Sequence, residues 1–179
     1  MSDSTFDLPG HVVFRFRPEH AALLQGLCER CSAYFELHDG APPGPTIGEE
    51  EVVARPDGKT LDDKFLFGIR SATGELVGVL DLIRDFPAAG EWWVGLLLLD
   101  PRERSAGLGA RFYRAAEAWA AEQGARRVLL GVLEQNPDAE RFWRRLGFGE
   151  LRRQPYTAPT GHQSTLIVMS RQVPHAGAP

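Results

Sequence analysis

The chain has 179 residues, of which 43% are hydrophobic and 25% are charged, and its formal net charge at pH 7 is −4. These proportions are typical of a folded globular protein and exclude a chain that is disordered throughout. The acidic balance also argues against nucleic acid or a membrane surface as a partner, because both attract basic protein surfaces. The sequence has no apolar run of about 18 residues and no signal-peptide pattern at its start, so we expect a cytoplasmic protein.

Hydrophobic periodicity and turn residues divide the chain into short segments of regular structure. An alternating or unbroken apolar pattern predicts strands, and apolar residues three or four positions apart predict helices. In chain order we predict strand 11–17, helix 18–35, helix 46–54, strands 64–70, 76–84 and 91–99, helix 108–123, strand 128–133, helix 137–146, and strands 148–156 and 164–171.

This order of elements predicts a mixed α/β (α+β) fold with one mixed sheet and the element order β-α-α-β-β-β-α-β-α-β-β. The strand–helix–strand unit from Trp93 to Leu133 predicts two adjacent parallel strands joined by a right-handed crossover. We expect a single domain over residues 11–172, with a tail of residues 1–10 before it and a tail of residues 173–179 after it.

The loop after strand 91–99 is the most informative stretch of the sequence. Arg104, Gly107 and Gly109 lie between the end of this strand and a predicted helix. Glycines let the backbone approach a ligand closely, and the free amides and positive dipole end of a helix start favour a phosphate. A tight turn without a ligand would use the same glycines, so this loop alone leaves both interpretations open. No dinucleotide-binding or Walker loop fits, because Phe112 replaces the third glycine and no G-K-[ST] occurs.

Two motifs resemble those of the GNAT superfamily of acyl-CoA-dependent N-acyltransferases. Residues 104–109, Arg-Ser-Ala-Gly-Leu-Gly, match the family signature [RQ]-x-x-G-x-[GA]. Residues 136–148, NPDAERFWRRLGF, match a second signature, N-x-x-A-x-x-[FY]-[YW]-x-x-x-G-F. The resemblance is close over residues 91–149 and is limited to the order of elements elsewhere. It implies a GNAT-like fold in which the two central parallel strands splay apart.

The resemblance also implies where acetyl-CoA binds. The backbone of one central strand would pair with the pantetheine arm as if it were an added strand. The amides of the glycine loop would hold the pyrophosphate, and Asn136 would form a hydrogen bond near the pantetheine. The implied cofactor-binding residues are Leu97, Leu98, Leu99, Arg104, Ser105, Ala106, Gly107, Leu108, Gly109, Ala110, Asn136 and Trp143.

The positions that carry catalytic groups in the family are different here. Many members have a Tyr general acid where this chain has Trp143, and an indole N–H cannot deliver a proton in this pH range. Members with a Glu base on the fifth strand have it where Gly131 stands, and others have a Glu at the position of Trp93. A base is still needed, because a lysine-like amine has a pKa of about 10.4 and is mostly protonated near neutrality.

Asp81 and Glu134 are the two catalytic candidates that we select for this base. Asp81 interrupts the apolar strand 76–84, where an unpaired carboxylate would be costly, and Glu134 follows strand 128–133. Both residues also fit the simpler interpretation of a solvated strand face. Tyr156 could supply a replacement hydroxyl, or it could be an ordinary strand tyrosine.

Four aromatic residues, Tyr34, Phe35, Trp92 and Trp93, either wall a pocket for a small amine or belong to the core. In the first case Gly131 would widen the cleft. The choice between pocket and core is open at this level.

The sequence therefore predicts an N-acetyltransferase that moves an acetyl group from acetyl-CoA to a primary amine of a small molecule or peptide, by direct attack in a ternary complex. The alternative is a catalytically weak or inactive acyl-CoA-binding module; an oxidoreductase would require nicotinamide binding. We predict no metal, because the histidines are scattered, and we interpret Cys28 and Cys31 as buried core thiols. The acceptor's identity and the oligomeric state, a homodimer included, stay open.

Overall fold

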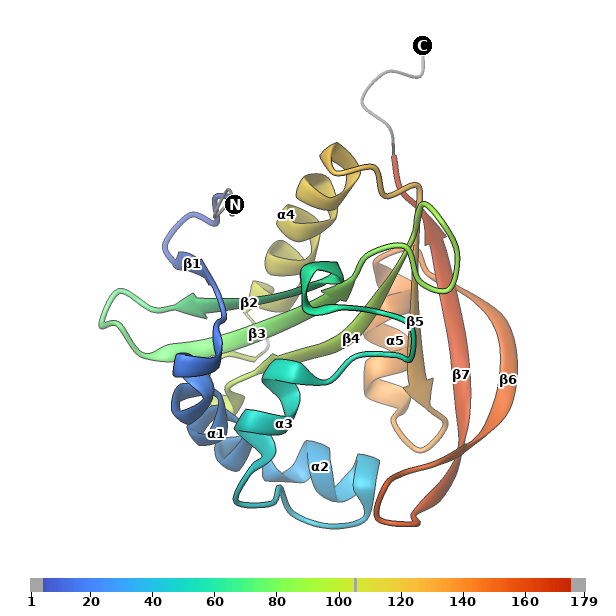
Figure 1. Cartoon of the computed structure of the whole chain (residues 1–179), viewed down its shortest axis with the longest axis horizontal. Coiled ribbons are helices and arrows are strands. Elements are labelled where there is room, and N and C mark those ends of the chain that lie inside the picture. Colours follow the sequence, from blue (N-terminus) through green and yellow to red (C-terminus); the bar gives the residue numbers. More distant parts are fainter. Residues whose placement is uncertain (1–4, 105, 175–179) are drawn as a thin grey trace.

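The computed structural model describes residues 5–104 and 106–174. Within these residues one seven-stranded sheet has the strand order β1-β2-β3-β4-β5-β7-β6 (Figure 1). The strands β4 and β5 are parallel and every other neighbouring pair is antiparallel, which confirms the predicted mixed α/β fold. The elements are β1 Val12–Arg15, α1 Ala21–Arg30, α2 Ser32–Asp39, α3 Ile47–Val53, β2 Lys64–Arg70, β3 Leu76–Ile83, β4 Glu91–Leu99, α4 Leu108–Glu122, β5 Arg127–Leu133, α5 Pro137–Arg145, β6 Gly149–Thr157 and β7 Gln163–Gln172.

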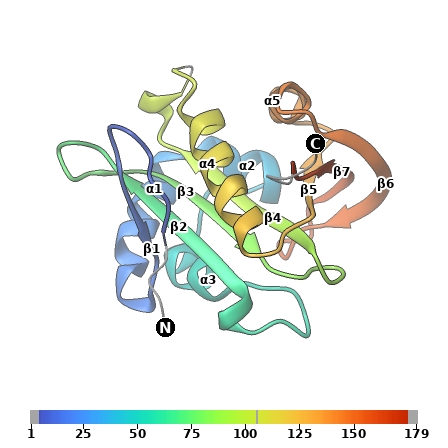
Figure 2. The ribbon, with the colours of Figure 1, turned by 90° about the horizontal axis from the view of Figure 1, so that it is seen from above.

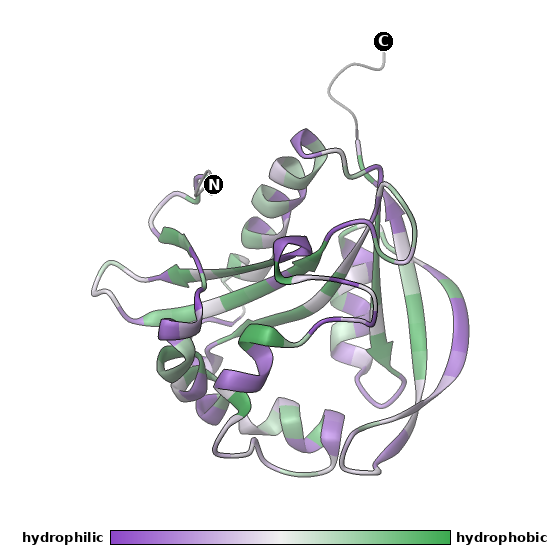
Figure 3. Ribbon diagram, viewed as in Figure 1, coloured by the Kyte–Doolittle hydropathy of each residue, from purple (hydrophilic) through white to green (hydrophobic). Residues whose placement is uncertain are grey.

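Helices cover both faces of the sheet (Figure 2). On one face α4 packs through Phe112 and Trp119 against the central strands. On the other face α1, α2 and α3 enclose a second apolar cluster that includes Leu27 and Phe35. The central strands are correspondingly apolar, whereas β6 at the edge is almost wholly exposed and carries long hydrophilic stretches (Figure 3). Amphipathic helices and strands thus bury their apolar sides on the two faces of one sheet.

The two central parallel strands separate partway along their length. Residues 91–94 of β4 pair with residues 127–130 of β5, and the pairing between these two strands ends there among the residues that the structure describes. On the other side β4 continues to pair with β3, but its register shifts at Gly95, so that Asp81 faces Leu96 while the next residue of β3 faces Val94. This bulge bends β4 at the point where the strands diverge. The result is the splayed pair that the family resemblance implies.

The first predicted helix is wrong in one respect. A 3-10 turn at residues 18–20 is followed by two helices, α1 and α2, which meet at Cys31. Cys31 has φ −102° and ψ 26°, and its N–H donates to the carbonyls of Leu27 and Cys28, so the chain changes direction there. The apolar stripe runs through the break without a glycine or proline, and periodicity alone therefore predicts one continuous helix.

Parts of the two expected tails are packed on the core. Phe6 meets the ring of Phe67 edge-on with centroids 5.0 Å apart, and Leu8 is buried. Val173 is buried too, and its N–H donates to the carbonyl of Arg126. These apolar side chains extend the core beyond residues 11–172. Over the described part of the chain, none of the helices is both long and apolar enough to span a membrane.

Candidate acyl-transfer site

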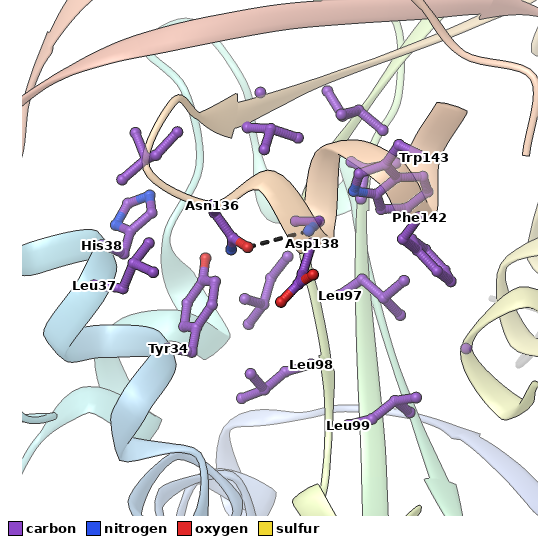
Figure 4. Close-up of a pocket in the computed structure, with 18 of the residues that line it drawn as sticks. Tyr34, Leu37, His38, Leu97, Leu98, Leu99, Asn136, Asp138, Phe142 and Trp143 are labelled. Carbon is purple, nitrogen blue, oxygen red and sulfur yellow. Dashed lines mark hydrogen bonds between the residues drawn. The ribbon is translucent and has the colours of Figure 1, made fainter. Parts of the chain in front are cut away.

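A cavity of about 520 Å³ lies where β4 and β5 separate. Figure 4 shows its walls: Tyr34 and His38 project from α2 on one side, and Asn136 and Trp143 belong to the opposite side. The cofactor-binding residues expected from the sequence that line it are Leu97, Leu98, Leu99, Arg104, Gly109, Asn136 and Trp143. The expected residues Ala106, Gly107, Leu108 and Ala110 belong to the adjoining loop and first turn of α4, and Ser105 lies outside the described residues.

The start of α4 has the geometry of an anion-binding loop. Gly107 precedes the helix with φ +74°, a conformation that glycine adopts without the steric cost that a Cβ would impose. Among the described residues, no side chain caps this end of α4, so its first amides are available to a ligand. Because Gly109 has no Cβ, the helix backbone can lie close to the end of β4; an added Cβ would be only 3.1 Å from Leu99 Cδ1. The two glycines therefore have different roles, the first in the turn and the second in close approach.

A buried ion-pair network that sequence analysis missed fixes the end of β4. The Asp100 carboxylate accepts from Arg30 Nε at 2.6 Å and from Arg102 Nη2 at 2.8 Å, and its side chain is 1% exposed. The hydrogen bonds from Arg102, together with that from Arg30, hold the pKa of Asp100 well below its usual range. Arg104 Nε donates to the Leu99 carbonyl at 3.2 Å. The network thus anchors the loop that leads to α4.

The other wall of the cavity is built by the first turn of α5. Asn136 Oδ1 accepts from the Ala139 N–H at 3.1 Å, which caps the helix and leaves the side-chain amide group of Asn136 beside the cavity (Figure 4). Trp143 is only 6% exposed and packs edge-on against Tyr113 at 5.1 Å and Phe148 at 5.2 Å. The Trp143 ring is thus largely core, and only part of it borders the cavity.

Comparison with known proteins agrees with this arrangement. The model of the acetyltransferase (GNAT) family matches residues 31–148. The chain belongs to this family. An acetyltransferase structure from Thermus thermophilus is 25% identical, has a TM-score of 0.67, and aligns over 94% of this chain and 99% of that chain. Among curated proteins, none matches the chain.

Two further solved structures share the fold. Spermidine N-acetyltransferase from Vibrio cholerae, in complex with CoA and spermine, has a TM-score of 0.70 at 14% identity over 92% of this chain and 96% of that chain. The ribosomal-protein-S18-alanine N-acetyltransferase from Escherichia coli has a TM-score of 0.68 at 15% identity over 93% and 96%. Family membership confirms the resemblance seen in residues 104–109 and 136–148.

The two acidic residues selected from the sequence have different surroundings in this GNAT protein. Asp81 is 5% exposed, and its Oδ2 accepts from Lys64 Nζ at 2.6 Å. Burial raises the pKa of Asp81 to about 6 against the opposing effect of Lys64. Its carboxylate lies behind the cavity wall, because a Cβ at Gly95 would be 2.5 Å from Asp81 Oδ2. Glu134 has a side chain that is 56% exposed, is paired with Arg153 at 2.7 Å and is not part of the cavity lining.

We predict that Lys64→Met lowers the free energy of unfolding by about 3 kcal/mol near pH 8, because it leaves the buried Asp81 carboxylate without its counter-charge. The loss should be smaller near pH 5, since a carboxyl group whose pKa is raised favours the folded state at low pH and disfavours it as pH rises. Urea unfolding at both pH values measures this. Adding Asp81→Asn to Lys64→Met should recover most of the loss near pH 8, and an equal loss at both pH values would contradict the prediction.

Helix α2 supplies a wall of the cavity that sequence analysis identified only in part. Tyr34 lines the cavity, and its ring stacks on His38 at 5.5 Å; His38 meets Tyr156 at 5.2 Å and lies 2.8 Å from Asp39 through Nδ1. Phe35 is buried in the core instead. Stacked rings with a nearby carboxylate favour a cationic ligand. Helical spacing predicts that His38 lies one turn from Tyr34 on the same side of the helix, but it does not predict that His38 lines a cavity.

Gly131 and Trp93 stand at the positions that hold a Glu in other family members, and apolar side chains pack against both. The space next to Gly131 is taken by Leu166, whose Cδ1 would be 2.8 Å from an added Cβ, so Gly131 does not widen that side. Trp93 meets Phe86 edge-on at 6.0 Å, and Trp92 is fully buried in the core. The described residues contain no group of three or more His, Cys, Asp or Glu side chains that could hold a metal.

Proposed function

We propose that this protein transfers an acetyl group from acetyl-CoA to a primary amine of a small molecule or peptide, by direct attack in a ternary complex. The observation that carries the proposal is the convergence of three features on one cavity. These are the splayed end of β4, the glycine-bearing start of α4 and the polar aromatic wall of α2. The first two fit an acyl-CoA and the third fits an amine.

The residues around the cavity fit coenzyme A in chemistry as well as in shape. The backbone of residues 97–99 would pair with the amide-bearing pantetheine between β4 and β5. The amides of Arg104 and of residues 106–110 would hold the pyrophosphate at the helix start, with Ser105 in the same segment. Asn136 and Trp143 would border the pantetheine from α5. Acetyl-CoA supplies an activated thioester as co-substrate.

The reaction proposed needs little help at the leaving group. The amine nitrogen attacks the thioester carbon, and the tetrahedral intermediate expels a thiolate whose conjugate acid has a pKa of about 8.5. The Trp143 indole N–H can donate a hydrogen bond but cannot supply a proton. Proton removal from the incoming ammonium is therefore the step that requires a protein group.

An alternative is an acyl-CoA-binding module with weak or no catalysis, which Trp143 and Gly131 favour because they replace the family's acid and base. The test combines calorimetric titration of acetyl-CoA with release of free thiol over a panel of amines. The panel should contain polyamines and an N-terminal alanine peptide, since two structural neighbours are named for spermidine and for an alanine of ribosomal protein S18. We expect saturable binding and amine-dependent thiol release. Binding without release for every amine would favour the module.

A further inference from the structure

The proposed transfer needs a base, and both carboxylates selected from the sequence are engaged elsewhere. Asp81 is paired with Lys64, and Glu134 is paired with Arg153 at the surface. A third carboxylate, that of Glu51, belongs to α3. Helix α3 packs against α1, and its Val52 belongs to the apolar cluster on the face of the sheet that α1 and α2 cover (Figure 1). Asp81 points to the same face, because it follows Val79 of this cluster by two residues along β3.

The packing of α3 determines which of its three consecutive glutamates points inward. Gly48 lies against α1 so closely that an added Cβ would be 2.3 Å from the Ala21 carbonyl oxygen. This contact fixes the rotation of α3, and Glu51 lies one turn after Gly48 on the same side. Glu51 is half-buried, whereas Glu49 and Glu50 are exposed. Helix phase therefore separates Glu51 from its two neighbours.

The Glu51 carboxylate is partly enclosed but unpartnered. None of the residues that the structure describes forms a hydrogen bond or an ion pair with it. Tyr34 lines the cavity, and its pKa is raised first by its own burial and second by the negative charge of Glu51. The pKa of Tyr156 is raised as well, mainly by burial and then by the negative charges of Asp39 and Glu51. Glu51 thus lies within electrostatic reach of both hydroxyl groups on the acceptor side.

The carboxylate of Asp81, whose charge acts on Glu51, is also incompletely satisfied. Asp81 is 5% exposed, and its Oδ1 has no hydrogen-bond partner among the described residues, although Oδ2 is paired with Lys64. A buried polar atom without a partner is rare unless a ligand or water completes it. This atom belongs to the carboxylate behind Gly95 in the cavity wall. Neither carboxylate is among the residues that line the cavity, but Asp81 lies directly behind Gly95 of its wall, and Glu51 is close enough to Tyr34 of its wall to influence the pKa of that tyrosine. A cation held between Tyr34 and these two carboxylates would complete both.

We propose that Glu51 is the general base of the transfer and that the acceptor is a protonated primary amine bound between Glu51 and the rings of Tyr34 and His38. This inference rests on the proposed acetyl transfer. The Glu51 carboxylate takes one proton from the ammonium group, and the freed lone pair forms the bond from nitrogen to the thioester carbon. The carbon–sulfur bond then breaks, the thiolate leaves with the electron pair, and it takes the second proton from nitrogen. Glu51 afterwards releases its proton to water.

The electrostatics of the site suit this role. Burial raises the pKa of Glu51 to about 7, with Lys64 opposing the rise and Asp81 adding to it. A base works best when its pKa is near the working pH, because it is then both ionised and able to hold a proton. The titratable or charged groups around Glu51 are Cys28 of α1, Tyr34 and Asp39 of α2, Glu50 of α3, Lys64 of β2, Asp81 of β3 and Tyr156 of β6.

The test compares Glu51→Gln with Glu49→Gln, a matched change on the exposed side of the same helix, using the best amine of the panel. We expect kcat/KM of the wild type to rise with pH to about 7 and then to level off. Glu51→Gln should lower kcat/KM by about 100-fold at pH 7 and make it rise about tenfold per pH unit up to pH 9, because only free amine then reacts. Glu49→Gln should leave the profile unchanged, and acetyl-CoA should bind equally to all three proteins.

Glu51→Asp keeps the proposal testable if glutamine prevents folding. The aspartate keeps a carboxylate but is one methylene shorter, so the carboxylate lies farther from the amine. The variant should keep the inflection near pH 7 with about tenfold lower kcat/KM. A Glu51→Gln enzyme with wild-type kcat/KM and pH profile, or a Glu51→Asp enzyme without the inflection, would overturn the assignment of the base while acetyl transfer stands. Absence of turnover by the wild type with every amine would overturn both.

Discussion

Replacing Asp100 with asparagine is expected to lower the free energy of unfolding at pH 7 by about 3 kcal/mol, because it removes one partner of a buried charge network. The carboxylate of Asp100 is 1% exposed and accepts from Arg30 and Arg102. In asparagine one carboxylate oxygen is replaced by an NH2 group, which is itself a donor and cannot accept a hydrogen bond from a guanidinium. Because the network holds the end of β4, the Kd for acetyl-CoA should also rise about tenfold. Denaturant unfolding and calorimetry measure the two effects.

The pH dependence of stability gives this prediction a second readout. The folded-state pKa of Asp100 is depressed, so its contribution is present above the usual carboxyl pKa of 3.8 and is lost as pH falls below it. Between about pH 6 and pH 3 the wild type should therefore lose more stability than Asp100→Asn. Asp57→Asn, in an exposed turn, serves as control and should behave like the wild type. Parallel losses in wild type and Asp100→Asn would contradict the role of the network.

Substituting Gly109 with valine is expected to raise the Kd for acetyl-CoA by about 100-fold or more, a cost of about 2.7 kcal/mol. The added Cβ would lie 3.1 Å from Leu99 and 3.5 Å from Phe142, and the γ-carbons would crowd this part of the cavity wall, where we propose that the coenzyme binds. Gly109→Ala adds only the Cβ and should have a smaller effect. Calorimetric titration with acetyl-CoA measures both, with thermal unfolding to confirm that each variant is folded.

Gly107→Ala separates ligand approach from turn formation. A Cβ at Gly107 would meet no atom of the described residues within 4 Å, so the substitution is expected to strain only the left-handed backbone at φ +74°. It should lower stability by about 1 kcal/mol and change the Kd by less than about threefold. Unchanged binding by Gly109→Val would contradict the proposed binding of acetyl-CoA against this helix start.

Much of the fold follows from local pattern in the sequence. The strands predicted at 64–70 and 91–99 have the bounds observed for β2 and β4, because apolar and β-branched runs end there at turn residues. The parallel arrangement of β4 and β5 follows from the helix between them. The break at Cys31 could not be predicted, since neither a glycine nor a proline marks it and the apolar stripe continues through it.

The parts of the site that depend on the backbone and on a sequence motif could be predicted. The parts that depend on side chains far apart in the sequence could not. The loop at 104–109 is recognisable because its arginine and two glycines lie within six consecutive residues. The partner of Asp81 is Lys64, and only the register between β2 and β3 brings the two together. Likewise, three glutamates in a row give no sign of which one faces inward. Glu51 is distinguished only once Gly48 is seen to press against α1.

A crystal structure with bound coenzyme A tests the central claim most directly. We predict the pyrophosphate within hydrogen-bonding distance of the amides of residues 107–110, and the pantetheine lying along residues 97–99 between β4 and β5. Coenzyme A bound at another place, or the space between these strands empty at saturating coenzyme A, would contradict the account.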